Sequence, residues 1–154
     1  MSPSVGTAGE GDLGELLVLM RAYCDFYAAA PGDEALLGLS RALIADPARE
    51  GVQLIARDDA QDPPPAVGFA TVYWTWSTTR AARIGVMNDL FVTEPARGTG
   101  AGDALIAACA QRCREHGAVA LTWQTARDNH RAQALYDRVG ARRSQWLDYD
   151  LPVA

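Results

Sequence analysis

Apolar residues recur at helical spacing near the start of the chain. They lie three or four residues apart at Leu13, Leu16, Leu17, Met20, Tyr23, Cys24 and Tyr27. This spacing predicts a helix that starts at Asp12, which can cap it, and that ends at Pro31-Gly32. A second helix with the same spacing is predicted from Asp33 to Asp46.

Strand-like segments dominate the middle of the chain, because β-branched and aromatic residues gather there. The predicted strands cover residues 52–56, 67–77, 84–93, 119–124 and, as a final strand, 141–151. Two further helices are predicted over 99–116 and 129–139, each followed or ended by a glycine that can adopt a left-handed conformation. Helices therefore come first, a three-strand meander follows, and strands and helices then alternate, which is typical of an α/β domain.

Length and composition indicate one globular domain. The chain has 154 residues, of which 49% are hydrophobic and 21% charged, and both values are ordinary for a single domain. Residues 1–11 are rich in Gly, Ser and Thr, so we expect a disordered N-terminus followed by one domain over 12–154. No apolar run approaches the ~20 residues that span a bilayer, and no secretory signal is evident. We expect a cytoplasmic protein without a membrane partner.

Charge excludes several classes of function. The formal net charge of −5 argues against a nucleic-acid partner and weakly suits a cationic substrate. All 14 basic residues are Arg, so no Lys is present for Schiff-base chemistry or a Walker phosphate loop. Three cysteines, an odd number, indicate a reducing compartment. Cys109, Cys113 and His116 share a predicted helix face but lack a fourth ligand, so we predict no metal site.

A glycine-rich turn joins the third predicted strand of the meander to the next helix. It reads Arg97-Gly98-Thr99-Gly100-Ala101-Gly102. Glycines let the backbone approach a ligand closely, and the first N–H groups of a helix attract anions such as pyrophosphate. Arg97 adds a permanent positive charge. The spacing fits neither the dinucleotide fingerprint nor a Walker loop, and a glycine-rich turn without a ligand is the alternative.

The sequence resembles the GNAT superfamily of N-acetyltransferases. The superfamily signature Gln/Arg-x-x-Gly-x-Gly/Ala matches residues 97–102, and a second segment, 121–141, is similar to the superfamily's fifth strand and fourth helix, with Asn129 followed seven residues later by Tyr136. The resemblance runs from about Val67 to Leu151. It implies an α/β GNAT fold with a mixed, mostly antiparallel central sheet, splayed fourth and fifth strands and about four flanking helices.

The resemblance also implies acetyl-CoA as the co-substrate, with no metal. Strand-four backbone groups would hold the pantetheine arm, the glycine-rich turn the pyrophosphate, and Asn129 the pantetheine amides, while Tyr136 would lie beside the thioester sulfur. The cofactor-binding residues implied in this way are Leu90, Phe91, Val92, Arg97, Gly98, Thr99, Gly100, Ala101, Gly102, Asp103, Asn129 and Tyr136.

Direct acetyl transfer requires a neutral amine, although free alkylamines have a pKa near ~10.4. The Val92 N–H is the candidate donor to the developing oxyanion, and Tyr136 is the candidate general acid. Many family members place a Glu near the end of the fifth strand, but Gln124 stands there and cannot act as a base. Asp89, in the segment MNDLFV, is the next candidate base.

Asp89 also has a structural interpretation, since it can simply pair with an arginine such as Arg83 or Arg127. Trp74 and Trp76 can line an acceptor pocket or instead form a buried sheet face or a dimer interface. A homodimer is one expected assembly, because dimers are common in the superfamily.

Resemblance to polyamine-type members in the strand-four segment and in Trp146-Leu147-Asp148-Tyr149, and to histone- and polyamine-type members in Trp123-Gln124-Thr125, favours a small amine acceptor. One alternative is an acetyltransferase for protein or peptide N-termini. A second is a non-catalytic acyl-CoA-binding sensor, and a third is a purely structural module.

Overall fold

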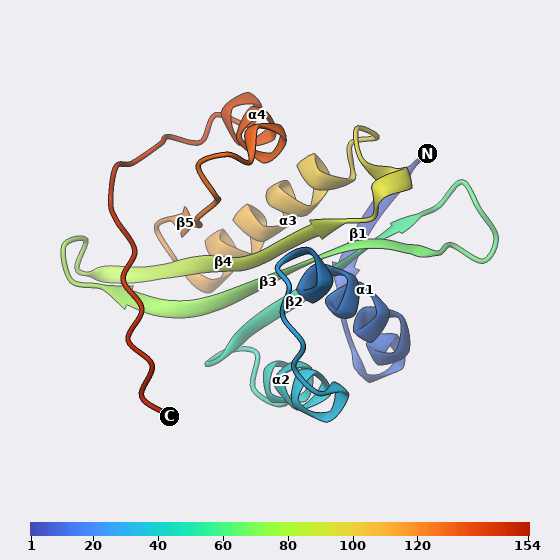
Figure 1. The fold of residues 1–154 in the computed structure, drawn as a ribbon, viewed down its shortest axis with the longest axis horizontal. Helices are drawn as coiled ribbons and strands as arrows, with labels where there is room; N and C mark the ends of the chain where they lie inside the picture. Colours follow the sequence, from blue (N-terminus) through green and yellow to red (C-terminus); the bar gives the residue numbers. More distant parts are fainter. The chain divides into compact units, whose positions relative to one another are not determined.

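Five strands form one sheet in the order β1-β2-β3-β4-β5 in the computed structural model, which describes residues 1–154 (Figure 1). The strands are β1 (Pro3–Thr7), β2 (Gly51–Asp58), β3 (Ala66–Ser77), β4 (Ala82–Val92) and β5 (Leu121–Thr122). The first four pair antiparallel, whereas β5 pairs parallel to β4 at Gly85 and Val86 only. This arrangement confirms the predicted mixed, mostly antiparallel sheet.

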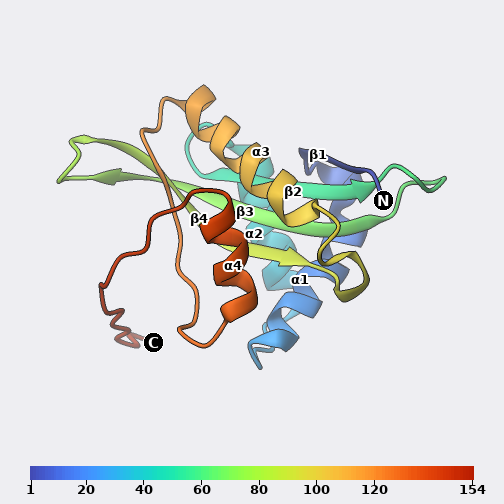
Figure 2. The ribbon, with the colours of Figure 1, turned by 90° about the horizontal axis from the view of Figure 1, so that it is seen from above.

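The chain divides into two compact units, Met1–Gln124 and Thr125–Ala154. Within the first unit, two helices cover one face of the sheet and a third covers the other face (Figures 1 and 2). The helices are α1 (Leu13–Phe26), α2 (Asp33–Ala45) and α3 (Ala101–His116), and the second unit holds α4 (His130–Arg138). All four predicted helices are present. No helix combines the length and the hydrophobicity needed to cross a membrane.

The hydrophobic core forms where the apolar stripes of the helices meet the sheet. Leu16, Met20 and Phe69 are almost completely buried in the cluster between α1 and the sheet. On the opposite face, α3 buries Leu105 and Cys109. The helical spacing of these residues explains their burial, since positions three or four apart lie on one face of a helix.

The N-terminal segment corrects one prediction. We expected residues 1–11 to be disordered, but residues 3–7 form β1, which pairs with β2 from Pro3 opposite Asp58 to Thr7 opposite Leu54. The segment is short and consists mainly of small residues, so it shows no apolar alternation. Ladder bonds to β2 supply the order that its own composition does not. The extent of a single domain over 12–154 stays a prediction.

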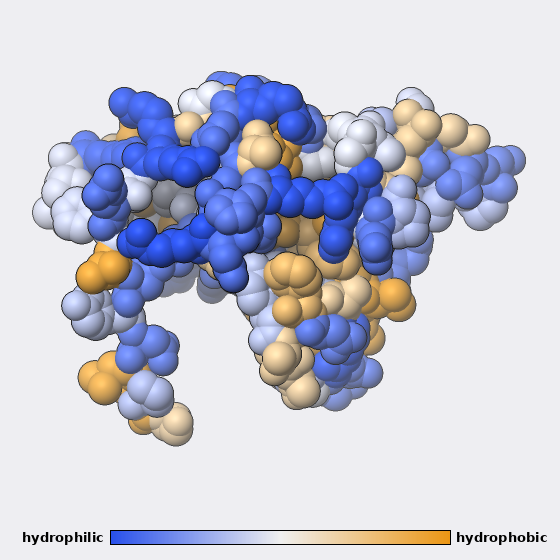
Figure 3. Space-filling view, turned by 45° about the horizontal axis from the view of Figure 1, so that its top comes forward, coloured by the Kyte–Doolittle hydropathy of each residue, from blue (hydrophilic) through white to orange (hydrophobic).

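The predicted final strand over 141–151 is wrong in this structure, which assigns no strand or helix to residues 141–154. Large side chains of this segment are exposed, including Trp146 at 87% and Tyr149 at 93%. Some orange, hydrophobic atoms also lie at the surface along the tail at lower left in Figure 3. The alternation of apolar and polar residues is real, but alternation describes only one strand. A strand also requires a neighbouring edge that provides ladder bonds.

Asp12 does not cap α1 with its side chain, contrary to the prediction. Its carboxylate instead accepts the Gly9 N–H at 2.8 Å and Nη2 of Arg57 at 2.7 Å, while Nη1 of Arg57 donates to Glu15 at 2.8 Å. The Gly9 N–H, with Arg57, holds the pKa of Asp12 below its usual range despite partial burial. This network ties the start of α1 to β2.

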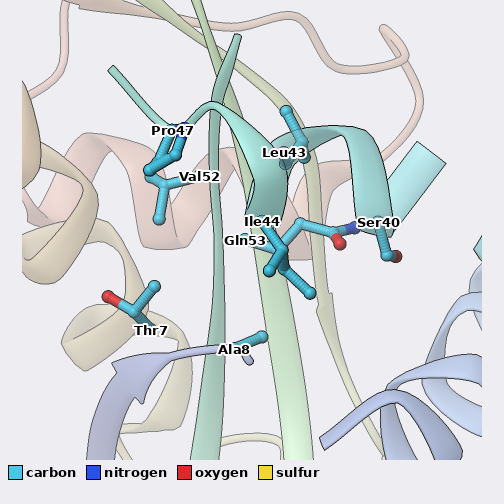
Figure 4. A pocket seen from close by; sticks show the side chains of 8 residues that line it. All are labelled: Thr7, Ala8, Ser40, Leu43, Ile44, Pro47, Val52 and Gln53. Atoms are coloured by element: carbon cyan, nitrogen blue, oxygen red, sulfur yellow. The ribbon is translucent and has the colours of Figure 1, made fainter. Parts of the chain in front are cut away.

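A small cavity of about 190 Å³ lies between the end of β1, α2 and β2 (Figure 4). Ser40 and Gln53 are two of its polar lining residues, and the Ser40 hydroxyl and the Gln53 amide both approach the sulfur of Met20. None of the sequence-predicted site residues lines this cavity. The candidate site is therefore elsewhere in the molecule.

Candidate active site

The glycine-rich turn adopts the backbone that its sequence predicts. After β4, a 3-10 turn over Glu94–Ala96 leads into Gly98 with φ of +78° and Gly100 with φ of +97°, and α3 follows at once. Both angles lie in the left-handed region that disfavours other L-residues. A Cβ atom at either glycine would have no neighbour within 4 Å. The backbone conformation, and not crowding, requires glycine, and the space in front of the turn is open.

The start of α3 presents backbone donors. The first helical bond joins the Ala104 N–H to the Gly100 carbonyl at 3.0 Å, so the N–H groups of the first helical residues have no acceptor within the helix. Thr99 donates its hydroxyl to the Ala96 carbonyl and thereby orders the turn. Ala101, Gly102 and Asp103 form the first turn, where the helix dipole favours an anion.

Arg97 is held against the end of β4. Its Nε donates to the Val92 carbonyl at 3.0 Å, and its guanidinium carbon lies 6.0 Å from the centre of the Phe91 ring. A permanent positive charge is therefore fixed at the entrance to the turn. Together with the helix start, it makes the junction of β4 and α3 suitable for binding a phosphate-containing ligand.

A β-bulge interrupts β4 just before the predicted catalytic segment. Val72 faces Met87 and Thr71 faces Asp89, so Asn88 is the extra residue. Beyond the bulge, the Thr93 N–H donates to the Val67 carbonyl at 2.9 Å. Backbone groups alternate along an antiparallel pair.

This alternation fixes the direction of the backbone after the bulge. Because Thr93 bonds toward β3, Phe91 and Asp89 also direct their N–H groups toward β3. Leu90 and Val92 direct theirs to the opposite edge, on the β5 side, and β5 pairs with β4 only as far as Val86. The structure thus gives the Val92 N–H the orientation that an oxyanion donor on this edge requires.

Asp89 lies beside two tyrosines and not in an ion pair. Nδ2 of Asn88 donates to its carboxylate at 3.0 Å. Burial and the negative charge of Asp89 raise the pKa of Tyr73 to about 12, and the same two causes raise the pKa of Tyr23. Arg83, one of the predicted ion-pair partners, lies instead over the Trp76 ring at 5.1 Å.

The second unit carries the remaining predicted residues. Asn129 caps α4, as expected, because its side-chain oxygen accepts the Ala132 N–H at 3.2 Å. Tyr136 lies seven residues further along the chain, in the last turns of α4. The first unit brings together Asp89, Val92 and the turn. The roles assigned to Asn129 and Tyr136 stay predictions.

Other residues singled out in the sequence are engaged in the fold. Nε1 of Trp74 donates to the Pro47 carbonyl at 2.9 Å, and the Trp74 ring stacks on His116 with 4.0 Å between ring centres. Trp76 is 68% exposed. Cys109 is fully buried in α3, which raises the pKa of its thiol to about 12. It behaves as a small core side chain.

Sequence reasoning missed Tyr23, Tyr73 and the bulge at Asn88 as parts of the site. Tyr23 was assigned to the apolar stripe of α1, where it does contact Phe69 and Phe91 through its ring. Its hydroxyl nevertheless donates to the Asn88 carbonyl at 3.4 Å. A tyrosine within an apolar stripe is the only sequence signal of this contact, because a buried hydroxyl requires a polar partner.

Comparison with known proteins places the chain among acetyltransferases. A family model described as the acetyltransferase (GNAT) family matches residues 18–141. The uncharacterized N-acetyltransferase YhfO of Bacillus subtilis (strain 168) is 31% identical over 137 residues, covering 89% of this chain and 88% of YhfO. The D-amino-acid N-acetyltransferase HPA3 of Saccharomyces cerevisiae is 39% identical over 82 residues, which span 53% of this chain and 51% of HPA3.

The fold is shared with a solved acetyltransferase structure. AAC(6')-Iy in complex with the bisubstrate analog CoA-S-monomethyl-acetylneamine superposes with a TM-score of 0.83 at 17% identity, covering 100% of both chains. At this identity the likeness concerns the fold alone.

Proposed function

The chain belongs to the GNAT family of acetyltransferases, and on this premise we propose that it transfers the acetyl group of acetyl-CoA directly to the primary amine of a small acceptor. The observation that carries the proposal is the junction of β4 and α3. It combines two left-handed glycines, the N-terminal turn of α3 and a fixed arginine with a bulged strand whose Val92 N–H faces away from β3.

The residues present fit the co-substrate. The open turn over 97–103 would hold the pyrophosphate, and the backbone of Leu90, Phe91 and Val92 would hold the pantetheine arm as an additional strand would. Asn129 and Tyr136 would hold the pantetheine amides and the region of the sulfur. When bound, acetyl-CoA supplies the activated acyl group.

Three groups of the chain would handle the protons and the charge. The acceptor ammonium loses one proton to Asp89, directly or through water, and its neutral nitrogen forms a bond to the acetyl carbon. The nitrogen releases its second proton to water as the amide forms. The Val92 N–H stabilises the negative charge on the carbonyl oxygen. As the carbon–sulfur bond breaks, the Tyr136 hydroxyl gives its proton to the sulfur. The products are an acetamide and the free thiol of CoA.

Small acceptors are supported by the name of one protein to which the chain is similar. HPA3 is named for D-amino acids, which offer an amine on a small molecule. Polyamine-like acceptors belong to the same chemical class and suit the acidic chain, whose net charge is −5.

A matched pair of glycine variants tests the site. Gly98 and Gly117 flank α3 with φ of +78° and +80°, and neither has an atom within 4 Å of its Cβ position. Gly98→Leu and Gly117→Leu should therefore lose similar stability, about 1–2 kcal/mol. Calorimetric titration should show that only Gly98→Leu weakens acetyl-CoA binding, by at least tenfold. Equal affinities in the two variants would contradict the proposed pyrophosphate site.

Turnover is tested by release of CoA thiol over a panel of amines, amino acids and peptides. We expect release with small primary amines and a large loss of kcat in Tyr136→Phe, with acetyl-CoA affinity retained. Binding of acetyl-CoA without release for any acceptor would indicate the sensor alternative. Absence of binding in the folded protein would indicate a structural module.

A further inference from the structure

We propose, on the basis of the proposed function, that Asp89, Tyr23 and Tyr73 form the acceptor subsite, and that it selects a cationic amine without a carboxylate next to its amino group. The cluster joins the end of α1 to the bulge in β4 and the middle of β3. All of its residues belong to the first unit of the structure.

The aromatic wall of the subsite is built into the core. The Tyr23 ring meets Phe69 edge-to-face at 5.8 Å and Phe91 at 6.4 Å between ring centres. These contacts lock the ring, while its hydroxyl reaches the Asn88 carbonyl on the bulge. The last turn of α1 extends the wall outward through Tyr27, whose ring lies 5.0 Å from Tyr23 and which is 55% exposed.

The charge of the cluster comes from Asp89. Tyr23 and Tyr73 both have a raised pKa because of burial and of the Asp89 charge, so both phenols are neutral at physiological pH. No arginine forms an ion pair with Asp89. The cluster is thus a carboxylate beside aromatic rings.

An alkylammonium group matches these features. It can donate hydrogen bonds to the Asp89 carboxylate and to the Asn88 carbonyl, which also accepts the Tyr23 hydroxyl. Tyrosine ring faces attract cations as well. Binding the ammonium form here also places the proton that must leave beside the carboxylate proposed to accept it.

The same charge disfavours amino acids. An α-carboxylate is separated from its amine by one carbon, so an amino acid docked through its amine would hold two carboxylates within a few ångströms of each other. Like charges at this distance repel, and more strongly where water is partly excluded. The subsite is therefore expected to differ in acceptor preference from the yeast relative named for D-amino acids.

The test uses pairs of acceptors that differ only in the carboxylate: phenethylamine with D-phenylalanine, and 1,5-diaminopentane with D-lysine. We expect kcat/KM from thiol release to be at least tenfold higher for the amine of each pair. In Asp89→Asn the ratio of the two kcat/KM values should fall toward one. Loss of a base slows both acceptors equally and leaves the ratio unchanged, whereas loss of the charge removes the repulsion that disfavours the amino acid.

Tyr23→Phe and Tyr73→Phe should raise KM for the amines with a smaller effect on kcat. Tyr149→Phe is the matched control, because Tyr149 is 93% exposed, and it should leave KM unchanged. A ratio that is unchanged in Asp89→Asn, or amino acids that react as well as their amines, would overturn the subsite.

Binding measured without turnover separates this inference from the proposed function. Phenethylamine is titrated calorimetrically into the protein saturated with CoA. If Asp89→Asn weakens phenethylamine binding at least tenfold and the wild-type protein transfers no acetyl group, the subsite is supported and the proposed function is contradicted. If acetyl transfer occurs but the preference for amines over amino acids is unchanged in Asp89→Asn, the proposed function is supported and the subsite is contradicted.

Discussion

Gly85 provides a quantitative test of how β3, β4 and α3 pack together. Its N–H donates to the Ala120 carbonyl at 2.9 Å, which is where β5 joins the sheet. The residue is buried, and its φ lies outside the left-handed region, so its backbone accepts alanine without strain. The cost of Gly85→Ala must therefore come from the space around the new methyl group.

That space is already filled. A Cβ atom at residue 85 would lie 2.6 Å from Sγ of Cys113, 3.0 Å from Cγ1 of Val72 and 3.1 Å from Cζ3 of Trp74. Overpacking a close-packed core by one methyl group typically costs about 1–3 kcal/mol. In a protein of this size, 1 kcal/mol corresponds to roughly 2–4 °C in melting temperature, so we expect a decrease of about 2–12 °C.

The assay is thermal and urea unfolding of Gly85→Ala beside Gly6→Ala, a strand glycine with nothing within 4 Å of its Cβ position. Gly6→Ala should retain wild-type stability within about 0.5 kcal/mol. The double variant Gly85→Ala/Cys113→Ala removes the nearest atom and should be more stable than the sum of the single variants predicts, by about 0.5–3 kcal/mol. Equal stability of the two alanine variants, or strict additivity in the double variant, would refute the packing described here.

Two further predictions follow from the ionisable groups. The pKa of Asp12 is lowered by the Gly9 N–H and by Arg57, so the stability that it contributes is complete above its unfolded pKa, near 3.8, and is lost as the pH falls through the lower folded value. Urea midpoints between pH 5 and pH 2 should therefore fall less steeply in Asp12→Asn than in the wild type, and parallel curves would contradict this. Burial raises the pKa of the Cys109 and Cys113 thiols, so at pH 8 a thiol reagent should modify half-buried Cys24 first and the other two only after unfolding, as mass spectrometry of the modified peptides would show.

Most of the fold was predictable because its main elements have clear periodicity. The helix over Ala101–His116 and the strand over Ala66–Ser77 follow directly from the spacing of their apolar residues. The N-terminal strand was not predictable in this way. Pro3–Thr7 is rich in small residues and lacks an apolar alternation, and its order comes from pairing with β2, which a local pattern does not contain. For residues 141–151 the pattern was present, but the structure contains no ladder partner for it.

In the candidate site, too, features that depend on local residue types were predictable, and contacts between residues distant in the sequence were not. The turn over Arg97–Gly102 was recognisable because its geometry depends on local residue types, namely glycines at left-handed positions before a helix. The neighbours of Asp89 come from α1 and β3, far away in the sequence, and no local spacing indicates them. Sequence therefore predicted the backbone of the candidate anion site residue by residue but supplied only one residue of the proposed acceptor subsite.

The bulge at Asn88 connects these two parts and explains why the sequence alone left the chemistry open. In a regular ladder, side chains and backbone groups alternate strictly, so one extra residue exchanges the directions of all residues that follow it. Asp89 can then face Tyr23 and Tyr73 while Val92 directs its N–H to the opposite edge. The carboxylate and the N–H donor of the proposed mechanism are thereby placed three residues apart on one strand.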